Sequence, residues 1–272
     1  MKPKTLKEAL EGKITEEEME KVVRSYDIVG DIAIIDIPEE LEHREKLIGE
    51  TVLSLHKNVN VVCKKSGIHE GEFRTQPLSV VAGEDRKETK YRENACTFYL
   101  NPETCYFSSR SSTERKRIAE LVQEGEEVLV MFSGIGPFPI VIAKHNKIKR
   151  IVGIEKNPDA HSYAEKNRAA NKVDVELICG DVNDVVLSLG VFDRVVMPLP
   201  KTGEHFLDVA LKALKPGGWL HFYDFQSEFE VALEKVKDAA KRAGREVLSS
   251  DIVKCGQYAP RVHRVCVDAK IS

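Results

Sequence analysis

The sequence predicts an α/β fold in which a smaller α+β module precedes a mostly parallel sheet that ends in an antiparallel edge hairpin. From Thr113 onward, segments with helical spacing alternate with short apolar runs, as in parallel strands joined by crossover helices. The last two expected strands are joined by Tyr258-Ala259-Pro260 without an intervening helix, so these should pair antiparallel at one edge. Before Asn101 the strand-like pieces are short and show no such alternation.

Composition limits the class of protein. The 272 residues are 42% hydrophobic and 31% charged, as in a globular protein with one large or two unequal domains. The net charge of -3 excludes a globally basic nucleic-acid binder but allows a local basic face. Because no apolar run reaches membrane length and no signal peptide is evident, we expect a cytoplasmic protein without membrane contact. The six cysteines contain no CxxC pair, so we expect reduced thiols and no metal site.

The first module should comprise residues 1–105, with its boundary where Asn101-Pro102 and a serine-rich run interrupt the pattern. Isoleucines between Tyr26 and Pro38 alternate as in a strand or a hairpin that turns at Gly30. The expected helices are Leu6–Leu10, Glu16–Val23 and Leu41–Leu55, and the expected strands are Val59–Cys63, Pro77–Ala82, Thr89–Arg92 and Cys96–Leu100.

The second domain should comprise residues 106–272. The expected helices are Thr113–Gln123, Phe138–His145, Asp159–Asn171, Gly203–Leu214 and Glu228–Ala243. The expected strands are Val128–Phe132, Ile151–Ile154, Val175–Cys179, Arg194–Met197, Trp219–Phe225, Glu246–Lys254 and His263–Ala269. The sequence Pro216-Gly217-Gly218 should form the turn into the fifth of these strands.

A glycine turn and two acids should lie together at one edge of this sheet. The first strand runs into a turn with Gly134 and Gly136, the second strand ends in Glu155, and Asp181 follows the third. Carboxyl ends of parallel strands share an edge, which is where open α/β sheets bind ligands. An acid at the tip of the second strand can accept hydrogen bonds from a ribose diol. This pattern favours a nucleotide-type ligand over an ordinary strand-to-helix turn.

The glycine spacing favours a ligand without phosphates. The third glycine of the dinucleotide fingerprint is missing, because Gly136 is followed by Pro137-Phe138. S-adenosylmethionine has an adenine, a ribose and a charged amino-acid tail but no phosphate, so it fits this loop better. The pattern resembles the class I methyltransferase sheet, with Val130 where many such enzymes have an acid before the loop.

Nearly the whole chain resembles one RNA-modifying family. The matching segments are SYDIVGDIAII, GEFRTQPLSVVAGED, YFSSR with TERKRIAELV, MFSGIGPF, KNPDA, MPLPKTGEHFLDVALKALKPGG and QYAPRVHRVCVDAKI. Together they resemble the archaeal and eukaryotic tRNA (guanine-37 N1)-methyltransferases and their wybutosine-pathway relative, the tRNA aminocarboxypropyl transferase. The resemblance implies a tRNA-recognition module followed by a catalytic domain that binds S-adenosylmethionine.

The resemblance also implies roles for individual residues. Glu114 corresponds to the general base that takes the proton from guanine N1, and Arg74 to the residue that stabilises the charge developing on O6. The cofactor would be held by residues at the strand ends: Phe132, Gly134, Gly136, Glu155, Lys156, Asp181, Val182 and Pro198. The anticodon arm of a tRNA would contact basic residues: Arg110, Lys144, Lys201, Lys254 and Arg261. We expect the protein to act as a monomer.

Two alternatives to methyl transfer stay open. The methyltransferases typically have Asn-Leu-Pro after the fourth strand, whereas this chain has Pro198, which offers neither a side-chain amide nor a backbone donor. Glu155, and the expectation that no further tRNA-binding domain precedes these segments, favour transfer of the aminocarboxypropyl group instead. GEFRT, MPLPK and YDIVGDIAII favour methyl transfer, which we expect. A protein that binds RNA without modifying it is the third possibility, although such a protein would not need Arg74 and Glu114.

Overall fold

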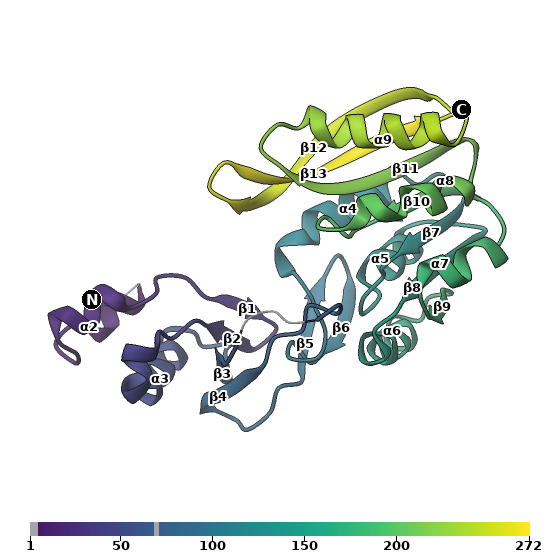
Figure 1. Cartoon of the computed structure of the whole chain (residues 1–272). Coiled ribbons are helices and arrows are strands. Elements are labelled where there is room, and N and C mark those ends of the chain that lie inside the picture. The colour runs from purple at the N-terminus through teal and green to yellow at the C-terminus, as the bar shows by residue number, and fades with distance from the viewer. Residues whose placement is uncertain (1–4, 68–70) are drawn as a thin grey trace. The chain divides into compact units, whose positions relative to one another are not determined.

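The chain forms two compact units in the computed structural model, which describes residues 5–67 and 71–272 (Figure 1). The first unit comprises Met1–Arg92 and Thr97–Ser109, and the second comprises Glu93–Cys96 and Arg110–Ser272. Residues 1–4 of the expected first module lie outside the described part. No helix in the described ranges has the length and apolar character needed to cross a bilayer.

The first unit is a four-stranded sheet with the order β1-β2-β3-β4. Its strands are β1 (Asp27–Val29), β2 (Ile32–Ile35), β3 (Val61–Lys65) and β4 (Leu78–Gly83), and its helical segments are α1 (Leu6–Leu10), α2 (Glu16–Lys21), η1 (Glu39–Arg44) and α3 (Glu45–Leu55). The hairpin expected around Gly30 is confirmed, because β1 and β2 pair antiparallel and Gly30 has a φ of +60°. The strands β2 and β3 are parallel, and η1 and α3 form the connection between them.

A separate two-stranded sheet connects the units in sequence. It consists of β5 (Thr89–Glu93) and β6 (Cys96–Leu100). The turn residues Asn94 and Ala95 both have positive φ, at 45° and 58°, as a two-residue type I′ hairpin turn requires. The tip of this hairpin groups with the second unit, where Glu93 makes a bidentate ion pair with Arg115 at 2.5 Å.

The second unit is built on a seven-stranded sheet with the order β12-β13-β11-β10-β7-β8-β9. Its strands are β7 (Glu127–Met131), β8 (Arg150–Glu155), β9 (Glu176–Cys179), β10 (Phe192–Met197), β11 (Leu214–Gln226), β12 (Val247–Ala259) and β13 (Val262–Ile271). The strands from β11 to β9 are parallel to one another, whereas β13 is antiparallel to both β11 and β12. The predicted mostly parallel sheet with an antiparallel edge hairpin is therefore confirmed.

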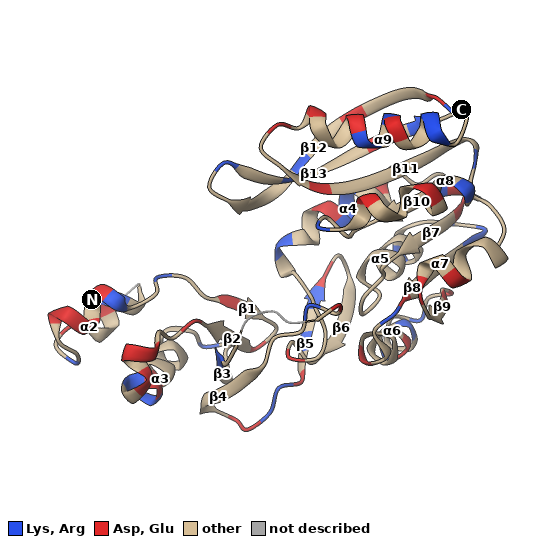
Figure 2. Ribbon diagram, in the orientation of Figure 1, with Lys and Arg blue, Asp and Glu red and all other residues tan. Residues whose placement is uncertain are grey.

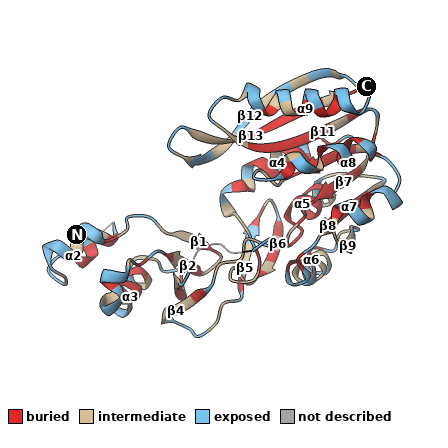
Figure 3. Ribbon diagram, viewed as in Figure 1, coloured by how far each residue is buried: buried red, intermediate tan, exposed pale blue. Residues whose placement is uncertain are grey.

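Helices cover this sheet. They are α4 (Ser112–Leu121), α5 (Pro137–His145), α6 (Pro158–Asn171), α7 (Val182–Val185), α8 (Leu207–Lys212) and α9 (Glu230–Arg242), with the 3-10 segments η2 (Ser109–Ser111), η3 (Val186–Ser188) and η4 (Gly203–Phe206). The central strands are buried and the outward faces of α6 and α9 are exposed (Figure 3). Apolar side chains from one face of the sheet are buried against α7, α8 and α9, and this burial stabilises the unit. Alternate strand residues such as Val128 and Val130, which face the other side, are buried as well.

Two local features differ from the sequence expectation. The segment after β9 is helical in α7 and η3, where no helix was expected, because Asp181 caps it by accepting a hydrogen bond from the backbone of Asn183 at 2.9 Å. The expected turn at Pro216-Gly217-Gly218 is instead a bulge inside β11. Between the pairs Phe192↔Leu214 and Arg194↔Trp219, β11 uses more residues than β10, and Gly217 takes a φ of +76° there.

Candidate active site

The loop that follows β7 is shaped by three residues in left-handed conformation. Phe132, Gly134 and Gly136 have φ values of 57°, 57° and 83°. Gly136 is the N-cap of α5, and a Cβ there would lie 3.0 Å from Ile140 Cδ1, so the turn is tight as well as left-handed. The Phe132 ring packs edge-on against Phe206, with ring centroids 4.9 Å apart. The contact with Phe206 therefore helps to hold Phe132 in a left-handed conformation, which costs a non-glycine residue free energy.

Glu155, at the end of β8, faces this loop. Its Oε2 accepts a hydrogen bond from the Gly134 backbone at 2.7 Å, and its Oε1 accepts one from the Asn157 backbone at 2.8 Å. Burial raises the pKa of Glu155 against the opposing effect of these backbone donors. The Lys156 backbone also stabilises this carboxylate, and a carboxylate with about four acceptor sites retains capacity for a hydroxyl donor such as that of a ribose.

Asp181, which follows β9, forms an ion pair with Lys156, which follows β8. Lys156 Nζ lies 3.0 Å from Asp181 Oδ2, and the hydrogen bond from the Asn183 backbone, followed by that of Lys156, lowers the pKa of Asp181. The side chain of Val182 is buried in the core below. The structure thus brings together the predicted residues of β7, β8 and β9 at one carboxyl edge, because these strands are adjacent and parallel.

Pro198 follows β10 at the same edge and occupies a turn that suits proline. The Leu199 backbone donates to the Met197 carbonyl at 2.8 Å, which closes a three-residue turn centred on Pro198. Such turns need a φ near -75° at the centre, and the proline ring holds φ close to that value. Proline therefore stabilises this strand end even though it removes the amide that asparagine would supply.

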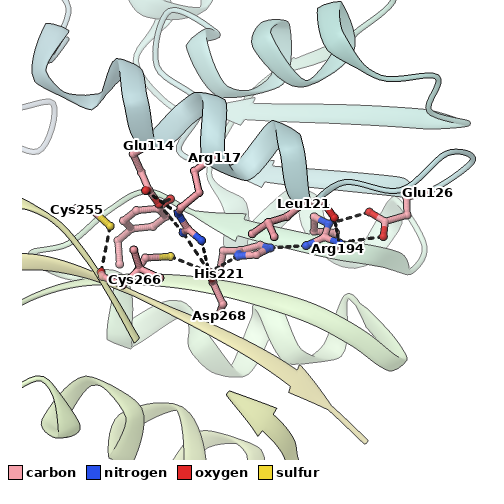
Figure 4. A network of polar contacts seen from close by, with 11 residues as sticks. Glu114, Arg117, Leu121, Glu126, Arg194, His221, Cys255, Cys266 and Asp268 are labelled. Atoms are coloured by element: carbon pink, nitrogen blue, oxygen red, sulfur yellow. Dashed lines mark hydrogen bonds and ion pairs between the residues drawn. The ribbon is translucent and has the colours of Figure 1, made fainter. Parts of the chain in front are cut away.

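Glu114 lies in α4 with its side chain only 6% exposed. The guanidinium of Arg117, one helical turn later, donates to Glu114 Oε2 at 2.8 Å and to Oε1 at 2.7 Å (Figure 4). The Tyr223 hydroxyl donates to Oε1 at 2.5 Å. Both lone pairs of Oε1 are therefore engaged, whereas Oε2 accepts one described hydrogen bond and retains one lone pair.

The network continues through the interior of the second unit. Arg117 also donates to Asp268 Oδ2 at 2.5 Å, and His221 Nδ1 lies 2.5 Å from Asp268 Oδ1. Arg194 Nη1 lies 2.6 Å from His221 Nε2, and the same guanidinium donates to both oxygens of Glu126 (Figure 4). Because a guanidinium can only donate, Nε2 accepts and the His221 proton lies on Nδ1, facing Asp268. The imidazole is therefore a neutral link between charged pairs.

His221, Cys266 and Asp268 lie close enough to hold a metal ion, with potential ligand atoms within 4.8 Å of one another. Their lone pairs already serve other contacts. Arg194 occupies His221 Nε2, Arg117 occupies Asp268, and two guanidinium charges would face any cation placed there. We assign no metal to this cluster.

The buried imidazole should make folding depend on pH. Burial, the largest influence, lowers the pKa of His221 despite the nearby Asp268 carboxylate. As pH falls below about 6.5, the unfolded chain takes up this proton before the folded one, so the free energy of unfolding should fall by about 1.4 kcal/mol per pH unit. Urea titrations between pH 7.5 and 5.5, followed by fluorescence of the single tryptophan, Trp219, measure this slope. A His221→Gln variant should have a flatter slope, and equal slopes would contradict the assignment.

Arg74 lies in the first unit, in the turn that begins at Gly71. Its backbone is left-handed, with a φ of 53°, and its N–H donates to the Gly71 carbonyl at 3.4 Å. The side chain is half-buried. This left-handed conformation costs a non-glycine residue free energy.

The predicted RNA-contacting residues are spread over the second unit (Figure 2). Lys201 follows Pro198, and Lys254 and Arg261 lie near the β12–β13 turn, so these three lie toward the carboxyl edge of the parallel strands. Arg110 lies in η2. Lys144 is different, because it lies in the last turn of α5 and its Nζ is 3.3 Å from the Asn171 carbonyl. The helix runs away from the glycine turn, so Lys144 lies toward the opposite edge.

The family model of the TRM5/TYW2 methyltransferase domain matches residues 89–248, which is more than half of the chain. The chain belongs to the TRM5/TYW2 family. The model of the TYW2 N-terminal domain matches residues 6–86. The resemblance inferred from the sequence motifs is thereby confirmed.

The relatives that are similar to this chain include proteins named for two different reactions. The tRNA (guanine(37)-N(1))-methyltransferase Trm5b of Pyrococcus abyssi is 40% identical over 91% of this chain and 75% of its own length. A crystal structure of Trm5b from that organism superposes with a TM-score of 0.86 at 37% identity, over 95% of this chain and 78% of that one. The tRNA(Phe) (4-demethylwyosine(37)-C(7)) aminocarboxypropyltransferase of Methanocaldococcus jannaschii is 33% identical over 90% of this chain and 97% of its own length.

A TRM5/TYW2 family structure with a bound small molecule is also similar. The TYW2 of M. jannaschii, solved in complex with S-adenosylmethionine, has a TM-score of 0.72 at 29% identity, over 91% of this chain and 99% of that one. The similarity extends over both units of the present chain. It therefore covers the loop after β7 and the strand ends that carry Glu155 and Asp181.

Proposed function

We propose that this protein transfers a methyl group from S-adenosylmethionine to N1 of guanine 37 of a tRNA. The observation that carries the proposal is the Glu114 carboxylate, which the Arg117 and Tyr223 donors hold in a fixed orientation with one lone pair on Oε2 left over. A base positioned in this way suits removal of a proton from a weakly acidic ring nitrogen. Relatives named as guanine-37 methyltransferases support the choice of substrate.

In the proposed reaction, each protein group has a separate task. Glu114 Oε2 takes the N1 proton as the new N–C bond forms, which leaves the methylated base neutral. Arg74 donates to O6, where negative charge develops as that proton leaves. The bound cofactor supplies an electrophilic methyl group on a sulfonium, which departs as a neutral thioether. Glu155 binds the ribose hydroxyls, and the Phe132 to Gly136 loop contacts the amino-acid end.

The residues of the second unit fit S-adenosylmethionine without needing a phosphate site. Glu155 retains acceptor capacity for a ribose hydroxyl beyond its backbone donors, and the left-handed glycines keep side chains out of the loop. Lys156, directly after β8, pairs with Asp181, which follows β9, and this pair suits the polar edge of an adenine. These three strand ends therefore provide acceptors and donors in the order in which ribose and adenine would require them.

Glu155 gives a direct test of this cofactor site. Replacing it with alanine removes two charge-assisted hydrogen bonds, so the Kd for S-adenosylmethionine should rise by about 10- to 150-fold, equivalent to about 1.5–3 kcal/mol. Isothermal titration calorimetry of the full chain measures the change. Glu165→Ala is the matched control, because Glu165 lies in α6 and forms an ion pair with Arg168. An unchanged Kd for the Glu155 variant would exclude it from the ribose site.

Transfer of the aminocarboxypropyl group is the second candidate. Two observations favour it: residues 6–86 match the TYW2 N-terminal domain, and Pro198 lacks the amide that methyltransferases use at this position. The same cofactor would then react through its γ-carbon rather than its methyl group. Glu114 would keep its task of taking a proton, now from a carbon of the tricyclic base.

Nucleoside mass spectrometry separates these reactions. The protein is incubated with S-adenosylmethionine and either unmodified tRNA or tRNA that carries the tricyclic wybutosine precursor. One added methyl on guanosine, with S-adenosylhomocysteine released, supports the proposal. An added aminocarboxypropyl group on the precursor, with methylthioadenosine released, overturns it in favour of the second candidate. No product from either RNA would indicate a protein that binds RNA without modifying it.

A further inference from the structure

The turn between β12 and β13 lies at the same edge of the sheet as the candidate active site. β11 is parallel to β10, and Gln226 near its carboxyl end pairs with His263 near the start of β13. The end of β12 pairs with the same residues, because Gln257 lies opposite His263 and Ala259 opposite Val262. The hairpin turn therefore reaches the edge where the strands of the cofactor site also end.

Two aromatic rings form a stack at this turn. The rings of Tyr258 and Phe225 lie 4.0 Å apart between centroids with an interplanar angle of 23°. Tyr258 is nevertheless 57% exposed. Since Phe225 covers one face of the Tyr258 ring, the exposure belongs largely to the opposite face and the edge. A flat aromatic surface, supported from below by a second ring, is thus presented to solvent.

The charges of the hairpin have a single sign. Between Asp251 and Asp268 the sequence contains no Asp or Glu, but it contains Lys254, Arg261 and Arg264. Lys254 and Arg261 are exposed, and Lys254 Nζ lies 3.4 Å from His263 Nε2. In a chain whose net charge is -3, this segment is locally basic. Basic side chains around an exposed ring are the combination that binds a polyanion with flat bases.

We propose that the Tyr258 ring is a stacking platform for an unpaired base of the RNA substrate, with Lys254 and Arg261 contacting the adjacent phosphates. This inference rests on the proposed function for the identity of the RNA. Stacking on an aromatic ring does not require one particular base, and phosphates next to the stacked base bring negative charge to the two cations. The two exposed cations of the hairpin, Lys254 and Arg261, favour a polyanion over a protein surface as the partner of this ring.

The test measures binding of an unmodified tRNA transcript to the full chain by fluorescence anisotropy, without cofactor. Tyr258→Ala should raise the Kd about tenfold or more, and Tyr258→Phe, which keeps the ring, should leave it unchanged. The matched control is Leu248→Ala, because Leu248 is also 57% exposed and also lies in β12. Lys254→Ala should lower the slope of log Kd against log salt, whereas Tyr258→Ala should leave that slope unchanged.

A second readout reports stacking itself. Transcripts with 2-aminopurine at each unpaired position of the anticodon loop, in turn, should include one whose fluorescence is quenched on binding by the wild-type and Tyr258→Phe proteins but not by Tyr258→Ala. A Tyr258→Ala protein that folds normally and binds tRNA as tightly as wild type would overturn the proposal. Wild-type tRNA binding with this ring dependence, but without product in the mass spectrometry, would support the platform while the proposed reaction failed.

Discussion

A Glu114→Gln variant should lose group transfer by about 10²- to 10⁴-fold, because glutamine cannot accept the proton that guanine N1 must release. Its binding of tRNA and of S-adenosylmethionine should be unchanged, since the carboxylate takes part in the chemical step only. Single-turnover rates with saturating protein measure the chemical step directly and separate it from binding. The affinities for both ligands are measured on the same preparation.

The control for this substitution lies on the same helix. Glu120 has a side chain that is 64% exposed and forms an ion pair with Lys116 at 3.7 Å. Glu120→Gln should leave the single-turnover rate unchanged. If Glu114→Gln folds, binds both ligands and turns over at the wild-type rate, Glu114 is a structural residue and another group must take the proton.

Replacing Arg117 with methionine should destabilise the second unit by about 3–5 kcal/mol. The guanidinium is the charged partner of two buried carboxylates, with side chains of Glu114 and Asp268 only 6% and 8% exposed. Without it, both carboxylates would remain buried without their cation. Burial raises the pKa of Asp268, but the His221 and Arg117 contacts outweigh that effect and hold the pKa well below its usual range. Without Arg117, one of the two contacts that lower the pKa of Asp268 would be lost. Urea denaturation at pH 7.5, followed by Trp219 fluorescence, reports on the second unit.

The neighbouring lysine provides the comparison. Lys116→Met changes a side chain that is 61% exposed, so it should alter the free energy of unfolding by less than about 0.5 kcal/mol. An Arg117→Lys protein keeps a cation beside the two carboxylates, so it should be more stable than Arg117→Met. If the two variants were equally stable, the charge of Arg117 would not be what stabilises these carboxylates.

Much of the fold follows from local pattern. Apolar runs and helical spacing predicted the seven strands of the large sheet and the hairpin edge, because the side-chain periodicity of each element is visible in its own sequence. The segment from Val182 to Ser188 was missed, since two short helical turns give too little periodicity to recognise. The bulge in β11 was read as a turn because Pro216-Gly217-Gly218 has the composition of one, and only pairing with β10 keeps it in the strand.

Some residues of the candidate site are also predictable from local sequence, and others are not. Glu155 and Asp181 were found because each follows an apolar run, so their positions depend on neighbouring strands alone. The network below Glu114 was missed, because its members are far apart in sequence: Arg117 and Asp268 are separated by 151 positions. A weaker signal was present. His221 and Asp268 are buried polar residues whose immediate neighbours in sequence are apolar, and such residues need buried partners.

The hairpin tip at Glu93–Cys96 decides how the chain can be shortened. A fragment that begins at residue 106 would retain Arg115 but lose Glu93, the acid that its guanidinium binds at 2.5 Å, and both side chains of this pair are only 3% exposed. In this fragment the surface that the Glu93–Cys96 turn covers would be exposed, and the Arg115 guanidinium would lack its buried carboxylate partner. Expression of the second unit alone should therefore start before Thr89, where the match to the methyltransferase domain also begins. The two units cannot be separated at one position in the sequence, because residues 93–96 group with the second unit and the residues on both sides of them group with the first.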